Sequence, residues 1–245
     1  MDNIFNENGL PFFTQKEIKM RQYLEQIFAL ELEAILRSSN PAWTMTQIEA
    51  PILTPRSLIN QNYTNEDIWA QEKQGYPTEY VLRPETTPGS YAYMAHVLEH
   101  QLIKPPFIVW QSGKSFRREQ EQPSKHCRFK EFYQQEFQCL FTDDTKNDYQ
   151  ELVLQPMADV FSRELAKESR IVPSDRLPAY SLKTMDIEVF NGDKWMEICS
   201  VSLRQDFPVK ARFSNKKGEV VEKNCLVLEV AIGLDRCVYN RQIKL

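Results

Sequence analysis

Apolar side chains recur at helical spacing near the start of the chain, from Ile18 to Leu36. A period of three to four residues gathers them on one broad face of a helix. Thr14 followed three positions later by Glu17 is a capping-box pattern, which marks the start of a helix. The sequence therefore predicts a helix over residues 14–38, with an apolar face broader than a single contact with a sheet requires.

Strand-like patterns fill much of the remaining chain. Residues 43–53 alternate and reach Pro51, which predicts a strand that ends at the proline. Further strands are predicted at 79–84, 106–119, 128–141, 181–190, 194–202 and 225–233. Helices are predicted at 88–103, 146–170 and 234–245. Because strands outnumber helices and follow one another through turns, we expect an α+β fold with an antiparallel sheet of six to seven strands flanked by helices.

Composition narrows the function classes. The chain has 245 residues and a net charge of −4, so a nucleic-acid or polyanion site would have to be a local patch. Seven glycines form neither of the common glycine-rich phosphate loops. Five cysteines without close pairs argue against a disulfide framework or a zinc site. We expect one domain over residues 1–245, with the cysteines as small buried side chains.

The ends and the apolar runs of the chain bear on its location. The N-terminus is acidic and lacks the basic segment of a signal peptide. No apolar run is long enough to cross a bilayer. A cytoplasmic protein without a membrane partner is therefore expected.

Residues 115–138 combine aromatic rings with charges of both signs. Alternate residues of a strand share a face, which places Arg117 with Glu119. The shared face of the next strand carries Arg128, Lys130, Phe132, Gln134 and Glu136. Guanidinium groups bind phosphate and an aromatic ring stacks on a nucleobase, so this face suits a nucleoside triphosphate. The alternative is a solvated sheet face with cross-strand ion pairs.

Three other stretches place polar residues among apolar ones. They contribute Arg83 and Glu85 at a strand end, Glu197 and Ser200 in one strand, Glu229 in another, and Arg236 at a helix start. A lone glutamate in an apolar strand is usually a paired structural residue. Two of them on separate strands, together with arginines, indicate a site for phosphates and Mg²⁺.

Three motifs in a fixed order make the chain similar to a known family. They are a long helix and strand that reach Pro51, F-R-x-E at 116–119 with R-x-x-x-F at 128–132, and G-Φ-x-R at 233–236. In this order they resemble the catalytic domain of class II aminoacyl-tRNA synthetases, in the glycyl, seryl, threonyl and prolyl subgroup. "LRPETTPG" resembles a glycyl-type sequence, and residues 185–212 resemble a seryl-type one.

The resemblance implies an ATP site on the sheet. Arg117 would contact the α-phosphate and stabilise the transition state, with Arg236 as the second catalytic arginine. Glu119 would bind the adenine amino group, while Phe132 and Arg236 would cover the two faces of the ring. Arg128 would hold the γ-phosphate.

The same resemblance implies the remaining ligands. Glu197, Ser200 and Glu229 would bind Mg²⁺ next to ATP. The amino acid would be held by Glu85, Gln134, Glu136 and Arg204. No side-chain nucleophile is required, because the substrate carboxylate attacks and the protein positions the reactants.

Amino-acid choice and acceptor stay open at this stage. Leu203, Ala231 and Thr87-Pro88 depart from the seryl and glycyl patterns. We expect activation of a small amino acid (glycine, serine or threonine) and its transfer to tRNA or a carrier. The family likeness implies a homodimer, and we expect a stand-alone domain without an anticodon-binding domain. The alternative is a non-catalytic paralogue that serves as an accessory subunit, for example of a nucleic-acid enzyme.

Overall fold

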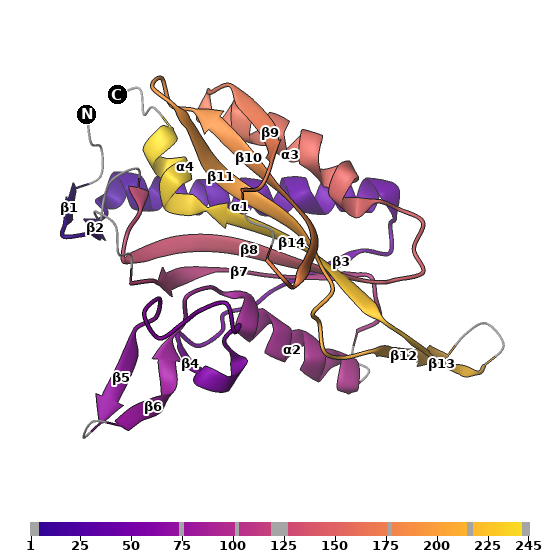
Figure 1. The fold of residues 1–245 in the computed structure, drawn as a ribbon. Coiled ribbons are helices and arrows are strands. Elements are labelled where there is room, and N and C mark those ends of the chain that lie inside the picture. Colours follow the sequence, from indigo (N-terminus) through magenta and orange to yellow (C-terminus); the bar gives the residue numbers. More distant parts are fainter. Residues whose placement is uncertain are drawn as a thin grey trace.

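The computed structural model describes residues 5–73, 76–100, 103–118, 127–175, 178–214 and 218–241. Within these residues a seven-stranded sheet forms the centre of the molecule (Figure 1). Its strands, in spatial order, are β3 (Thr44–Gln47), β7 (Phe107–Phe116), β8 (Glu131–Thr142), β14 (Cys225–Gly233), β11 (Trp195–Arg204), β10 (Ser181–Phe190) and β9 (Ser169–Pro173). β3 runs parallel to β7, and the other neighbouring strands are antiparallel. The predicted α+β fold and strand number are confirmed.

Helices pack on both faces of this sheet. α1 (Gln15–Ser39), α3 (Tyr149–Leu165) and α4 (Leu234–Asn240) share the larger apolar core with Phe137 of β8. α2 (Thr87–Glu99) lies on the opposite face, where its Met94 shares a smaller core with Leu140 of β8. Because neighbouring strand residues point to opposite faces, the polar residues at even positions of β8 face the α2 side.

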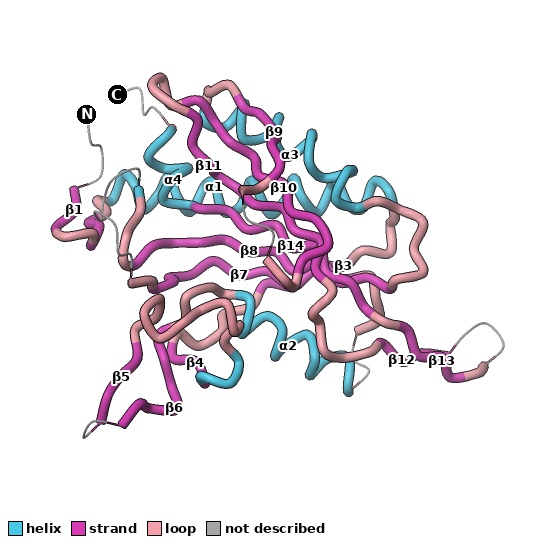
Figure 2. The backbone as a smooth tube through the Cα atoms, viewed as in Figure 1, coloured by secondary structure: helices cyan, strands magenta, loops and turns pink. Residues whose placement is uncertain are grey.

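Smaller elements surround the central sheet (Figure 2). A three-stranded sheet has the order β4 (Leu53–Pro55), β6 (Tyr76–Leu82), β5 (Ala70–Lys73), and the short 3-10 helix η1 (Arg56–Leu58) follows β4. Two hairpins are formed by β1 (Phe5–Glu7) with β2 (Leu10–Phe12) and by β12 (Ala211–Ser214) with β13 (Val220–Lys223). The β4–β6–β5 sheet lies next to α2 and so borders the same face of the central sheet (Figure 1).

Helix α1 begins where the capping box predicted. Thr14 is the N-cap, and its backbone N–H donates to the Glu17 carboxylate at 2.8 Å. Leu24, Phe28 and Leu32 of α1 are buried, and α1 contacts α3 and α4 as well as the core of the sheet. These two helices therefore cover much of the broad apolar face seen in the sequence.

The structure shortens two predicted elements. β3 ends at Gln47, before Pro51, and strand geometry resumes only at β4. The predicted helix over 146–170 is α3 followed by the separate strand β9. Ala166 ends α3 in a left-handed conformation with φ 52°, which the sequence did not indicate because glycine usually occupies such a position.

All five cysteines are free and buried, as predicted. No helix in the described part of the chain combines the length and apolar character needed to cross a membrane.

Candidate active site

Three buried glutamates converge on the α2 side of the sheet. Glu85 lies just before α2, while Glu136 and Glu229 lie on the adjacent strands β8 and β14. The Thr87 hydroxyl, in the first turn of α2, lies 3.0 Å from Glu136 Oε2 and 2.9 Å from Glu229 Oε2. Gln138 Nε2 donates to the same oxygen of Glu229 at 2.8 Å. We call Glu85, Glu136 and Glu229 the glutamate cluster.

Burial and mutual repulsion shape the protonation of the cluster. Burial raises the pKa of Glu136 to about 7, and the charges of Glu229 and Glu85 add to the rise. Burial, followed by the charge of Glu229, also raises the pKa of Glu85, although Arg204 and Arg117 oppose the shift. Carboxylates in this arrangement favour a cation between them, because it relieves both causes.

Arg204 is the buried cation of the site, with 2% of its surface exposed. Its Nη1 lies 2.7 Å from Glu229 Oε2, and its Nη2 lies 2.7 Å from Asp206 Oδ2. Its guanidinium carbon lies 3.9 Å from the ring centroid of Tyr180, and Tyr91 donates to Asp206 Oδ1 at 3.1 Å. Burial lowers the pKa of Arg204, but Glu229 and Asp206 outweigh this and raise it overall. Arg204 therefore stays charged and fixes one side of Glu229.

Arg117 follows β7 and reaches the same region. Its Nε donates to the Pro84 carbonyl at 3.0 Å, and its Nη2 donates to the Tyr63 hydroxyl at 3.0 Å. Its guanidinium carbon lies 5.2 Å from the ring centroid of Phe132. The structure thus brings together two residues predicted for ATP, the arginine and the ring. It also places this arginine one hydrogen-bonded residue away from Glu85, because Tyr63 donates to Glu85 Oε2 at 2.8 Å.

The surface of the central sheet between these groups, which we call the floor, is formed partly by glycine. Gln134 of β8 is opposite Gly113 on one neighbouring strand and Gly233 on the other. A side chain at Gly113 would overlap the Arg83 guanidinium, since an added Cβ would lie 2.1 Å from Arg83 Nη2. Gln134 is buried, and its Oε1 accepts no hydrogen bond from the described residues. Its amide is therefore available to a polar ligand on this floor.

Arg236 lies in the first turn of α4 and marks the other end of the floor. Its Nη1 donates to the backbone carbonyl of Glu197 at 2.9 Å and lies 3.5 Å from the Glu197 carboxylate. Both side chains are partly exposed, at 23% and 49% respectively. A phosphate or nucleobase that approaches from solvent can reach them.

Glu197, Ser200 and Glu229, predicted for Mg²⁺, lie on the neighbouring strands β11 and β14. Glu229 is opposite Ser202, whereas Ser200 is opposite Ala231, and Glu197 lies farther along β11. Glu229 Oε2 already accepts hydrogen bonds from Thr87, Gln138 and Arg204. Among the described residues, no group of three His, Cys, Asp or Glu side chains is placed to hold a metal ion. Protein donors thus occupy Oε2 of Glu229, and its assignment to Mg²⁺ stays a prediction. Glu197 and Ser200 do fit an ion held largely by substrate phosphates, as Mg²⁺ commonly is.

Glu119 and Arg128 are the other two residues predicted for ATP. Glu119 lies outside the described residues. Arg128 is exposed and precedes β8, which begins at Glu131, so it does not share a strand face with Phe132.

Four residues of the site escaped the sequence reasoning: Tyr63, Thr87, Gln138 and Asp206. Gln138 continues the even-numbered face of β8, and Asp206 follows Arg204 by two positions, so alternation and spacing carried a signal for both. Tyr63 lies in a loop without periodicity. Its role appears only when the fold brings it to Glu85.

Comparison with known proteins places this site in a family. The family model described as "tRNA synthetase class II core domain (G, H, P, S and T)" matches residues 68–240. The chain belongs to this family. Apart from Tyr63, every site residue discussed above lies within the matched segment.

Curated relatives and solved structures agree with this assignment. The chain is similar to glycine–tRNA ligases of Mycoplasmopsis synoviae (32% identity over 167 residues, 63% of this chain) and Mycobacterium bovis (31% over 172 residues, 64% of this chain). It spans 37% of the length of each. Its fold is similar to prolyl-tRNA synthetase of Cryptosporidium parvum, with TM-score 0.73 and 15% identity over 98% of this chain and 49% of the other. The corresponding Giardia lamblia structure, solved with prolyl-adenylate, gives TM-score 0.70 at 16% identity over the same shares.

Proposed function

We propose that this domain activates a small amino acid with ATP and passes it to an acceptor. In the first step the substrate carboxylate oxygen attacks the α-phosphorus, the bond to the β-phosphate oxygen breaks, and pyrophosphate leaves. The observation that carries this proposal is the position of the glutamate cluster next to Arg117. The Tyr63 hydroxyl is hydrogen-bonded to both Glu85 and Arg117 and so connects them. The two reacting ends, an ammonium-bearing carboxylate and a phosphate, would thus be held side by side.

The charges of the described site favour an ammonium group. Four carboxylates meet three guanidinium groups there: Glu85, Glu136, Glu229 and Asp206 against Arg83, Arg117 and Arg204. A bound phosphate would occupy Arg117 and leave the cluster more negative. An ammonium restores the balance and can donate hydrogen bonds to the carboxylate oxygens of Glu85 and Glu136.

Crowding around the cluster favours a small amino acid. Thr86, Glu136 and Gln138 are at most 2% exposed, so a long side chain would need space that these residues fill. We rank glycine first and serine or threonine next. The glycine–tRNA ligase relatives support this order, and Ala231, close to Glu136 in the register of β8 and β14, contributes no polar group that would select a hydroxyl.

ATP would occupy the floor between the arginines. Arg117 would contact the α-phosphate, and Phe132 and Arg236 would enclose the adenine ring. Charge-assisted hydrogen bonds from each arginine contribute roughly 1.5–3 kcal/mol. Mg²⁺, where it is bound, would neutralise phosphate charge beside Glu197 and Ser200. Glu119 and Arg128 remain predictions for the adenine amino group and the γ-phosphate.

The acceptor and the assembly are also proposals. The names of the curated relatives favour tRNA as the acceptor, with a carrier protein as the alternative. We propose a cytoplasmic homodimer, as the family likeness implied. A non-catalytic accessory subunit is less favoured, because the described arginines and glutamates of the site are arranged around one floor.

Pyrophosphate exchange into ATP, measured with each of the twenty amino acids, tests the proposal. We expect exchange with glycine to be fastest and to be abolished in Arg117→Ala, while circular dichroism shows an unchanged fold. Exchange that is fastest with a large amino acid would contradict the small-substrate assignment. ATP binding without exchange for any amino acid would favour the accessory-subunit alternative.

A further inference from the structure

We infer that Tyr63 is a positioning residue that couples the amino-acid site to the phosphate site by holding the side chains of Glu85 and Arg117 in fixed positions relative to each other. This inference rests on the proposed function, because it assigns those two residues to the two substrates. Tyr63 itself lies outside the segment that matches the family model.

The hydroxyl of Tyr63 makes both contacts at once. It donates to Glu85 Oε2 at 2.8 Å and accepts from Arg117 Nη2 at 3.0 Å. The Arg117 guanidinium carbon also lies 5.5 Å from the Tyr63 ring centroid. Burial raises the pKa of Tyr63 well above its usual value, so the hydroxyl keeps the proton that it donates to Glu85. A neutral hydroxyl can donate to a carboxylate and accept from a guanidinium at the same time.

The loop that carries Tyr63 is anchored on both sides of the contact. Its ring packs against a small apolar core of Ile59, Ile68 and Val81. After Tyr63, the Asp67 carbonyl accepts a hydrogen bond from the backbone N–H of Arg118 at 2.9 Å. The loop is therefore attached to the residue that follows Arg117. A shift of Arg117 toward a phosphate would be transmitted to Tyr63 through the backbone and the side chain together.

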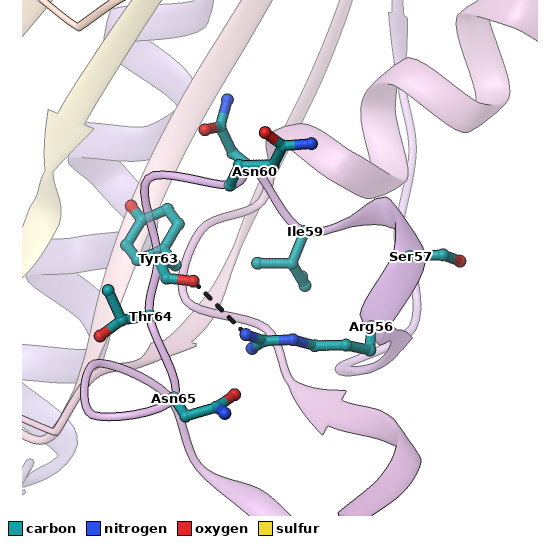
Figure 3. Close-up of a pocket in the computed structure, with 8 residues that line it drawn as sticks. Arg56, Ser57, Ile59, Asn60, Tyr63, Thr64 and Asn65 are labelled. Carbon is teal, nitrogen blue, oxygen red and sulfur yellow. Dashed lines mark hydrogen bonds between the residues drawn. The ribbon is translucent and has the colours of Figure 1, made fainter.

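The other side of the loop leaves room for such a shift. A pocket of about 480 Å³ is lined by residues 56, 57, 59–61 and 63–65. Figure 3 shows Arg56 extending across it to the Tyr63 carbonyl, a contact of 3.5 Å at the limit of a hydrogen bond. The loop is thus held firmly toward the active site and weakly toward the pocket. Small movements of Tyr63 would follow the groups that it bridges.

A bridged pair of sites has a measurable signature. If Tyr63 aligns Glu85 with Arg117, a ligand bound at one site should raise the affinity of the other site for its ligand, because the first ligand fixes the shared hydroxyl. We expect the amino acid identified by exchange to tighten binding of an ATP analogue with a methylene bridge between the α- and β-phosphorus by at least fivefold. In Tyr63→Phe, which removes only the hydroxyl, that factor should fall to less than twofold.

Isothermal titration of the full chain, with and without saturating amino acid, measures the two factors. The matched control is Tyr23→Phe. Tyr23 lies on α1, and its hydroxyl donates a hydrogen bond to Glu164 of α3 at 3.0 Å. This variant should keep the wild-type factor. If Tyr63 had a purely structural role, Tyr63→Phe would bind both ligands more weakly, but the factor by which the amino acid tightens binding of the ATP analogue would not change.

The outcomes separate this inference from the proposed function. If both ligands bind Tyr63→Phe with the wild-type factor, the role of Tyr63 is overturned and the proposed function stands. Binding of both ligands to the wild-type chain without coupling also overturns it. If the wild-type chain binds neither ligand, the proposed function fails and the inference fails with it.

Discussion

At the scale of single residues, Glu136 links the chemistry of the site to its stability. Its pKa is raised from 4.5 to about 7, mainly by burial. Between these pH values the unfolded chain releases a proton that the folded protein retains. The free energy of unfolding therefore falls as pH rises through this window, by up to about 1.4 kcal/mol per pH unit for one group. The site thus carries a charge that function requires and folding disfavours.

Glu136→Gln should separate these two effects. We expect the variant to be more stable than the wild type at pH 8, by roughly 1–3 kcal/mol, and nearly equal to it near pH 4.5. Urea denaturation at the two pH values measures this difference. The same variant should lose about 100-fold or more in kcat/KM for the amino acid, because the ammonium loses a charged partner. A variant that is less stable at pH 8 would show that Glu136 is not electrostatically strained.

The buried pair of Arg204 and Glu229 provides a second test at this scale. Removal of one partner leaves a buried charge uncompensated, so Arg204→Ala should cost about 3–5 kcal/mol of unfolding free energy. The matched control is Arg212→Ala, which breaks an ion pair with Glu222 whose side chains are 60% and 52% exposed. An exposed pair contributes about 0–1 kcal/mol. Equal losses in the two variants, measured by denaturant titration, would contradict the buried-pair assignment.

Residue types and alternation predicted part of this network. Glu136 and Gln134 were assigned to one face of β8 because strand residues alternate. The partner of Glu229 was not predictable in this way, since Arg204 lies on a different strand and its choice of partner depends on the register of β11 with β14. The sequence therefore suggested Mg²⁺ beside Glu229, and it did not indicate the guanidinium that the fold places at Glu229 Oε2.

At the scale of elements, the signals that held were local ones. The capping box marked the start of α1. The strands predicted at 181–190 and 194–202 form the pair β10 and β11, with Gly192 at φ +101° between them. The predicted end of α3 was wrong, because Ala166 adopts the left-handed conformation without the glycine that normally signals it. The apolar pattern simply continued into β9, where a different period applies.

Ala166→Gly should therefore stabilise the protein. Glycine adopts the left-handed conformation without the Cβ penalty, so we expect a gain of about 0.5–1 kcal/mol. The control is Ala34→Gly, at an exposed interior position of α1, which should cost about 1 kcal/mol because glycine disfavours a regular helix. Thermal unfolding of both variants measures the opposite signs. A loss of stability in Ala166→Gly would mean that the Ala166 side chain makes contacts that outweigh its backbone cost.

At the scale of the whole molecule, the order of the motifs predicted the fold but not its surface. Hydrophobic pattern and motif order require a sheet with helices on it, and the seven-stranded sheet follows. The pattern alone could not show how many helices share one apolar face. The structure places α3 and α4 against α1, so the surplus apolar surface expected on that helix is smaller than the sequence indicated.

Ile18, Tyr23 and Leu30 stay exposed on α1, at 36%, 44% and 59%, and a second group of exposed apolar side chains lies around the β4–β6–β5 sheet. Leu53 and Tyr80 lie on one face of this sheet, because the neighbouring pairs are Leu53 with Leu82 and Pro55 with Tyr80. They are 52% and 48% exposed, and Ile52 is 41% exposed. A two-fold interface uses the same patch on both copies, so a patch of this kind suits a homodimer. The proposed dimer therefore has a candidate interface on the β4–β6–β5 sheet.

Light scattering at micromolar concentration should give about twice the 28.9 kDa mass of one chain. Leu53→Glu should convert the protein to a monomer, because a carboxylate would be buried without a partner at the centre of the patch. The control is Leu182→Glu, since Leu182 is 50% exposed on β10, away from this sheet. That variant should remain dimeric. A dimer that survives Leu53→Glu would move the interface away from this sheet, and a wild-type monomer would reject the dimer itself.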